Sequence, residues 1–238
     1  MSSMRSSRWG VVIVLACAAV GKVFASSSTD DACLVTELPQ RLIDVDGKGR
    51  VHGAWSVPTG QLIEHLQRAR LPTGVLLAGY DILSVRRVCT EIGQADLERA
   101  HVVFGGREWL LARQGASAWE WLVSPVERVA TNLLSGRLSG IFVGPGKVVI
   151  GQGLERSTIT DPARMAAWLI DNHQARMEPV VLFVEKEYQQ SFLEFFSNNP
   201  LPGVFLSFDD AERVKETLNR YASISQDDQV RLLDYYCK

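Results

Sequence analysis

Short apolar runs alternate with amphipathic segments along most of the chain. The apolar runs have the length of buried strands and lie at 41–45, 74–79, 100–104, 179–184 and 203–208. Between them, apolar residues recur every three or four positions, as in amphipathic helices, at 59–69, 84–92, 161–173, 187–199 and 210–223. Strands that alternate with helices predict an α/β fold, in which a parallel sheet carries helices on its faces.

Polar residues at the starts of three predicted helices fit N-cap positions. Ser84 opens the segment 84–92, and Asp161 stands before Pro162, a residue favoured in the first helical turn. Asp209 or Asp210 is expected to cap the last predicted helix. These positions predict that the side chains stabilise helix ends and do not act as acid–base groups.

The predicted elements form two α/β domains, which a chain of 238 residues can accommodate. The first spans 34–115 and the second 137–223, with a partly helical connector at 116–136 and a tail at 224–238. Within the second, 140–151 predicts two short strands around a Gly-Pro-Gly turn. The segments WSVPTGQLIEHL, GVLLAG and VVFGG have counterparts in the same order in STITDPARMAAWL, PVVLFV and LSFDD. Internal duplication and the general recurrence of α/β patterns both explain this.

The first 25 residues are typical of an export signal. Arg5 and Arg8 precede an apolar run, and small residues at Ala25 offer a cleavage site. Two alternatives remain open: an uncleaved N-terminal anchor, and a lipoprotein modified at Cys17. The expected location is therefore the periplasm or another exported compartment, with no membrane span after signal removal. A formal net charge of -2 does not indicate a nucleic-acid-binding surface.

The remaining cysteines suggest a disulfide more than a metal site. No Cys-x-x-Cys or Cys/His pair has metal-ligand spacing, and no cofactor is predicted. Cys33 and Cys237 lie near the two ends of the mature chain, and domain termini are often close together, so we expect them to pair. Cys89 shares helical spacing with apolar neighbours and is expected to be a buried, unreactive thiol.

Three segments in one order resemble the rhodanese family. LIDV at 42–45 resembles its first strand, and VHGAWSVP at 51–58 resembles its Gly-Ala-x-x-aliphatic-Pro segment. VVFGGREW at 102–109 is similar to its strand, double glycine and tryptophan. The resemblance covers about a third of the chain, and the stretch between Asp44 and Gly53 is shorter than the family pattern. It implies a rhodanese-like first domain and leaves the second as a degenerate rhodanese-like repeat or a thioredoxin-like unit.

The resemblance also implies a catalytic cysteine after the central strand, and this chain lacks it. Aligned through Ser84, that position is Ala78. In such a site, backbone N–H groups and a helix N-terminus lower the pKa of the thiol and hold an anion. Asp81 adds a negative charge to the loop, and its carboxylate is a candidate occupant of the anion site.

In the family, the strand-end loop and the double glycine face each other across one rim of the sheet. We refer to the corresponding residues here as the rim: Ala78, Gly79, Tyr80, Asp81, Ile82, Leu83, Gly105, Gly106, Arg107 and Trp109. Because ligands of parallel sheets gather at the carboxyl ends of the strands, the rim is the predicted binding surface. The alternative is that its large side chains fold inward and fill the pocket in which the family has its catalytic site.

Two other features leave alternatives. Trp119 and Trp121 in the connector are expected either to pack one domain on the other or to form an exposed binding patch. The glycine-rich segment 144–153 does not have the phosphate-loop spacing and is interpreted as a turn.

These observations predict an exported, non-catalytic protein that acts as an interaction module for a protein partner in the cell envelope. An accessory role in a secretion or conjugation apparatus is the expected setting. One rival is a thiol enzyme, a sulfurtransferase or thiol–disulfide exchanger, that uses Cys33, Cys89 or Cys237. The other is a small-anion sensor that uses the loop at Ala78–Leu83, which lacks the catalytic cysteine.

Overall fold

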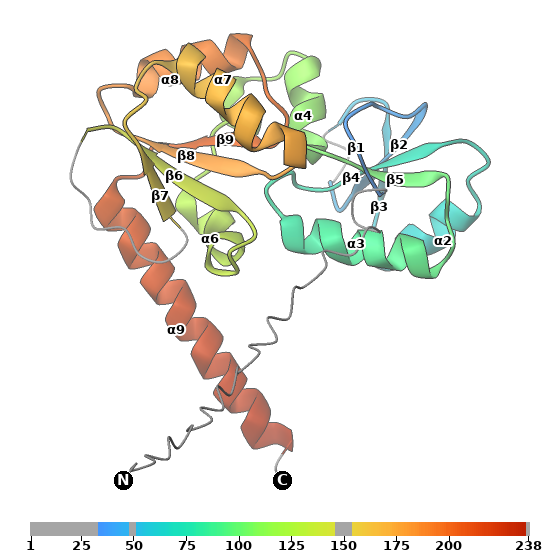
Figure 1. Ribbon diagram of the computed structural model, residues 1–238. Coiled ribbons are helices and arrows are strands. Elements are labelled where there is room, and N and C mark those ends of the chain that lie inside the picture. Colours follow the sequence, from blue (N-terminus) through green and yellow to red (C-terminus); the bar gives the residue numbers. More distant parts are fainter. Residues whose placement is uncertain (1–32, 48–50, 146–153, 237–238) are drawn as a thin grey trace, which may run out of the picture.

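The protein folds into two α/β units, each built on a parallel sheet, as the alternating pattern predicts (Figure 1). The computed structural model describes residues 33–47, 51–145 and 154–236. The predicted signal at 1–25 with Cys17 and Ala25, the end of the chain with Cys237, and most of the glycine-rich segment 144–153 lie outside these residues. Within them, no helix is both long and apolar enough to cross a membrane.

The first unit has a five-stranded sheet in the order β1-β5-β4-β2-β3, and all its pairings are parallel. The strands are β1 (Leu34–Val35), β2 (Arg41–Val45), β3 (Ala54–Val57), β4 (Thr73–Leu76) and β5 (Ala100–Val103). The helices are η1 (Thr59–Gln61), α2 (Leu62–Gln67), α3 (Ile82–Gln94) and α4 (Gly106–Arg113). The helices α2 and α3 cover one face of the sheet and α4 the other (Figure 1).

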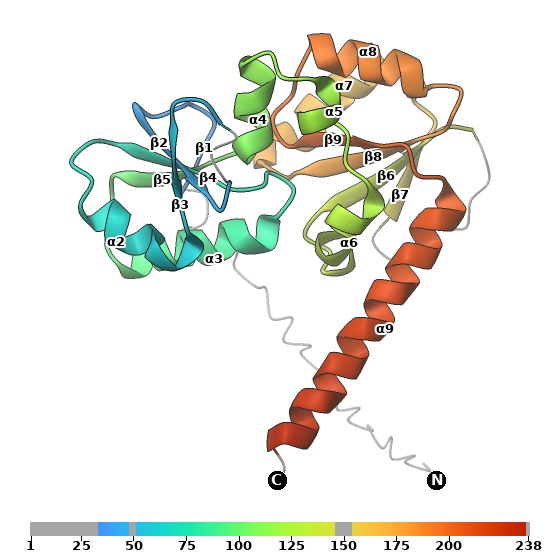
Figure 2. The same ribbon diagram turned by 180° about the vertical axis from the view of Figure 1, so that it is seen from behind.

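The second unit has a four-stranded parallel sheet in the order β7-β6-β8-β9. Its strands are β6 (Ser139–Val143), β7 (Leu154–Ser157), β8 (Val180–Val184) and β9 (Val204–Ser207). Its helices are α5 (Ala118–Trp121), α6 (Val126–Leu134), α7 (Pro162–Asn172), η2 (Gln174–Arg176), α8 (Gln189–Asn198) and α9 (Ala211–Tyr236). The helices α7 and α8 lie on one face, and α6 and the start of α9 on the other (Figure 2).

The two units share one topology. In chain order, β2, β3, α2, β4, α3 and β5 correspond to β6, β7, α7, β8, α8 and β9, and the spatial strand orders match. The edge strand β1 also has a counterpart, because Val123 forms a parallel bridge with Leu206 of β9. The three sequence segments that recur in both halves therefore occupy equivalent places.

Several boundaries differ from the sequence prediction. The N-cap of α3 is Asp81, not Ser84, because the Asp81 carboxylate accepts the Ser84 N–H at 3.2 Å. The predicted cap at Asp161 is confirmed, since its carboxylate accepts the Arg164 N–H at 2.7 Å. The connector 116–136 belongs to the second unit, and α9 continues as one helix past the predicted end at 223.

The predicted pairing of Cys33 with Cys237 is wrong, because Cys33 is bonded to Cys89, at a Cα–Cα distance of 5.7 Å. Cys89 is buried, as its spacing predicts, but it is not a free thiol. Cys89 on the inward face of α3 and Cys33 before β1 lie in the same core cluster, which also contains Val85 and Val88. The disulfide therefore fixes the start of the short edge strand to the helix that covers it.

Candidate functional site

The double glycine brings α4 against the loop that follows the central strand β4. Gly105 and Gly106 have φ angles of 79° and 57°, in the region that favours glycine. Ala78 forms a bridge with Gly106, and the Arg107 N–H donates to the Leu77 carbonyl at 2.8 Å. A Cβ at Gly106 would lie 2.2 Å from that carbonyl oxygen. The two glycines are thus required by a close backbone approach.

A carboxylate does occupy the loop, but it is not that of Asp81. The Glu108 carboxylate accepts the Gly79 N–H at 2.7 Å, whereas Asp81 accepts hydrogen bonds from the N–H and hydroxyl of Ser84. Burial raises the pKa of Glu108, although the bond from Gly79 acts in the opposite direction. Glu108, which does not belong to the predicted rim, therefore fills the place expected for an anion.

Arg107 points into the first unit instead of outward from the rim. Its Nε donates to the buried carboxylate of Asp44 at 2.7 Å, and a second guanidinium nitrogen donates to the Val45 carbonyl at 2.7 Å. Charge-assisted bonds of this kind are among the strongest in proteins. Arg107 thereby joins the start of α4 to the end of β2.

The second unit covers much of the rim. The ring of Tyr80 packs edge-on against Phe205 of β9, with ring centroids 5.7 Å apart. The Leu83 N–H donates to the side-chain amide oxygen of Asn132 at 3.3 Å. A Cβ at Gly105 would lie 2.9 Å from the Cβ of Pro202. These contacts come from the loop before β9, from β9 itself and from α6.

Other rim residues turn inward. Ile82 is buried in the core beneath α3, and Trp109 packs on the opposite face with apolar residues of β4 and β5. The structure thus brings the predicted rim residues together, but mainly as an internal contact between the two units. Ile82 and Trp109 thus turn inward as the alternative expects, whereas Tyr80 packs on the second unit.

The equivalent edge of the second sheet carries a pocket of about 390 Å³, which we call the edge pocket. It lies at the carboxyl ends of β6, β8 and β9, and Phe208-Asp209-Asp210 stand where the first unit has Phe104-Gly105-Gly106. Its lining consists of Phe142, Phe183, Val184, Glu185, Lys186, Gln189, Phe208, Asp209, Asp210 and Ala211. The rings of Phe142 and Phe183 are stacked, with centroids 4.9 Å apart.

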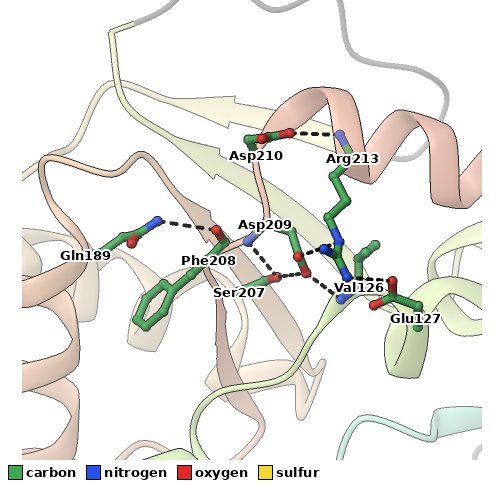
Figure 3. A network of polar contacts seen from close by, with 8 residues as sticks. All are labelled: Val126, Glu127, Gln189, Ser207, Phe208, Asp209, Asp210 and Arg213. Atoms are coloured by element: carbon green, nitrogen blue, oxygen red, sulfur yellow. Dashed lines mark hydrogen bonds and ion pairs between the residues drawn. The ribbon is translucent and has the colours of Figure 1, made fainter.

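Asp209 is the centre of a polar network beside the edge pocket (Figure 3). Its carboxylate accepts the Val126 N–H at 2.8 Å and the Ser207 hydroxyl at 3.0 Å, and it pairs with Arg213 at 3.0 Å. Arg213 also binds Glu127 at 3.0 Å. Asp209 therefore fixes the start of α6 to the start of α9.

Neighbouring groups complete this network. Asp210 confirms the predicted cap of the last helix, because it accepts the Arg213 N–H at 2.8 Å. The pKa of Glu127 is lowered because the Glu127 carboxylate accepts hydrogen bonds from the Glu127 backbone N–H, at the start of α6, and from Arg213. Gln189 donates to the Phe208 carbonyl (Figure 3) and to the Val184 carbonyl, which links the end of β8 to the loop after β9.

The two connector tryptophans differ in exposure, and only Trp119 has the exposed side chain that the binding-patch alternative requires. Trp121 is buried in the second unit, and its indole N–H donates to the Ala116 carbonyl at 3.2 Å. Trp119 is 60% exposed and meets Phe208 edge-on, with ring centroids 5.5 Å apart. Since Phe208 lines the edge pocket, Trp119 adds an exposed aromatic surface beside it.

In the described part of the chain, both cysteines are in the disulfide, and no group of three His, Cys, Asp or Glu side chains could hold a metal ion. Glu185 is held by Arg156 at 3.2 Å, whereas the exposed Lys186 lines the edge pocket beside it. The edge pocket thus combines an aromatic floor with Lys186 and with the carboxylate residues Glu185, Asp209 and Asp210. Trp119 stands exposed beside it, and this composition is suited to binding.

Comparison of the chain with protein-family models, with curated proteins and with solved structures finds no match. The functional assignment therefore depends on the geometry of the two sheet edges.

Proposed function

We propose that this protein is an exported, non-catalytic module of two rhodanese-like units that binds a protein partner in the cell envelope. The shared strand order favours an internal duplication over general recurrence of α/β patterns. The contact between Ala78 and Gly106 is what the family resemblance predicts for the strand-end loop and the double glycine. An accessory role in a secretion or conjugation apparatus is part of this proposal.

The observation that carries the proposal is the contrast between the two sheet edges. In the first unit, the Glu108 carboxylate and the packing of Tyr80 on Phe205 occupy the place of a catalytic site. In the second unit, the edge pocket remains accessible and Trp119 stands exposed beside it. Exposed tryptophans next to pockets are frequent anchors in protein interfaces.

The cysteine pairing supports an exported location and argues against a thiol enzyme. Disulfides persist mainly in oxidising compartments such as the periplasm. Cys33 and Cys89 are both bonded and nearly buried, whereas a reactive cysteine needs an accessible thiolate. At the rim, the Glu108 carboxylate already occupies the place expected for an anion, which argues against a small-anion sensor that uses this loop.

Capture of the partner from envelope extract tests the proposal. The mature protein would be compared with Trp119→Ala and with Trp55→Ala, an equally exposed tryptophan in the first unit. We expect Trp119→Ala to weaken capture by about 30-fold or more, as truncation of an interface anchor does. Trp55→Ala should leave capture intact, and neither variant should lower the melting temperature appreciably. Equal capture by the wild type and Trp119→Ala would contradict the proposed surface.

A sulfurtransferase assay tests the non-catalytic part of the proposal. The purified protein would be incubated with thiosulfate and a thiophilic acceptor. We expect turnover no greater than that of a protein-free blank, because Ala78 stands where the resemblance places the cysteine. Turnover above the blank that disappears in Cys89→Ser would favour the thiol enzyme instead.

A further inference from the structure

A second cavity, which we call the basic cleft, lies between the two units on a different side from the edge pocket. Its volume is about 530 Å³, within the range of small-molecule sites. The first unit contributes Leu34 of β1 and the first turns of α3. The second unit contributes Arg137, which precedes β6, and the segment from η2 to Pro179.

Three arginines from separate elements line the basic cleft. Arg86 lies on α3, Arg137 before β6 and Arg176 in η2, and all three are exposed. Among the described residues, Arg86 and Arg137 have no carboxylate within ion-pair distance. Arg176 pairs with Glu178 at 3.5 Å. The cleft therefore has an excess of positive charge.

Apart from Glu178, the remaining lining of the cleft is apolar. Leu34, Ile82 and Val85 line it on the first unit, and Pro179 lines it on the second. Met177, also in the lining, has a φ of 50°, a conformation that non-glycine residues rarely adopt. The basic cleft thus has two chemically different parts, an arginine-rich part and an apolar part.

We propose that the basic cleft binds a small amphipathic organic anion, with an apolar body and a carboxylate or similar anionic end. Arginine matches this group well, because its planar guanidinium makes paired hydrogen bonds to carboxylates and phosphates. The apolar body would lie on the leucine, isoleucine, valine and proline side chains, where it removes apolar surface from water. This site is independent of the edge pocket and of the protein partner.

Octanoate is the probe for this proposal, with octylammonium and inorganic phosphate as the two comparisons. Octanoate offers both required parts, octylammonium reverses the charge, and phosphate lacks the apolar body. Calorimetry should show octanoate binding in the millimolar range expected for a ligand of this size. Octylammonium should not bind measurably, and phosphate should bind at least severalfold more weakly than octanoate. Absence of octanoate binding, or equal binding of octylammonium, would overturn the proposal.

Neutral substitutions locate the site. Arg86→Gln and Arg137→Gln should each weaken octanoate binding by about tenfold, the effect of losing one charge-assisted hydrogen bond. Arg87→Gln is the matched control, because Arg87 follows Arg86 on α3 but does not line the cleft. All three variants should keep the melting temperature of the ligand-free protein. An equal loss of affinity in Arg86→Gln and Arg87→Gln would show that only overall charge matters and would reject the site.

Discussion

Two glycines and a neighbouring charged pair close the carboxyl edge of the first sheet. Gly79 and Gly106 allow two backbone segments to approach, since a Cβ at Gly79 would lie 2.3 Å from the Gly105 carbonyl oxygen. The Glu108 carboxylate accepts a hydrogen bond from the Gly79 N–H, and Arg107 forms an ion pair with the buried Asp44. These contacts explain why the apolar segment 100–104 is followed by two glycines and a charged pair.

Gly106→Ala should strongly destabilise the protein. The new Cβ would meet the Leu77 carbonyl oxygen at 2.2 Å, at a residue whose φ of 57° is unfavourable for alanine. Overpacking and backbone strain together predict a loss of about 2–4 kcal/mol in the free energy of unfolding. Gly60→Ala is the control, because a Cβ at Gly60 would have no neighbour within 4 Å and the φ of this residue is not positive. Similar urea midpoints for the two variants would refute this explanation of the double glycine.

Glu108→Gln should stabilise the protein at high pH. Because burial raises the folded-state pKa of Glu108, its protonated form favours folding. That contribution is complete below the unfolded value of about 4.5 and is lost as the pH rises through the folded-state pKa. Glutamine keeps an oxygen that can accept the Gly79 N–H without the buried charge. Its melting temperature should therefore exceed that of the wild type more at about pH 8 than at about pH 4. A constant or reversed difference would contradict the assignment.

Corresponding loops and helix starts of the two units make different contacts. The loop after β4 is packed under the second unit, whereas the loop after β8 lines the edge pocket. The double glycine before α4 allows a tight contact, whereas Asp209 and Asp210 before α9 bind the starts of two helices. One topology has thus been used once for an internal contact and once for an open edge.

Removing the disulfide should release the edge strand β1. The bond closes a loop between residues separated by 56 positions, for which chain-entropy reasoning predicts about 4 kcal/mol of stabilisation. Cys33→Ser combined with Cys89→Ser should lower the free energy of unfolding by up to this amount, as measured by urea denaturation. Non-reducing peptide mapping should recover the linked peptides of Cys33 and Cys89. A Cys33–Cys237 peptide, or alkylation of both residues without reduction, would reject the pairing.

At the scale of the whole molecule, the sequence pattern predicts the elements well because each depends on local periodicity. The apolar runs at 41–45 and 179–184 coincide with β2 and with β8 and its preceding residue. The contacts between distant segments are not encoded in this way. The helical spacing of Cys89 indicates burial but not that β1 brings Cys33 beside it.

In the candidate site, too, some contacts are expected from the sequence and others depend on how distant segments pack. The role of Ala78 and the meeting of its loop with the double glycine are expected only from the family resemblance, and Ala78 does form a bridge with Gly106. The covering of Tyr80 by Phe205 depends on how the second unit docks, which no local pattern specifies. The sequence pattern does not predict the edge pocket, because Asp209 and Asp210 fit the role of helix caps. Their alignment with Gly105 and Gly106 is the signal that could have found it.

We propose that the partner binds the open edge of the second unit. Site-specific photo-crosslinking in intact cells tests it most directly, with a photoreactive amino acid placed at Trp119, at Lys186 or at Trp55. All three positions are exposed, so the substitutions should preserve the fold. We expect the same crosslinked partner from positions 119 and 186 and none from position 55. Crosslinks from position 55 alone, or equal crosslinking at all three positions, would contradict it.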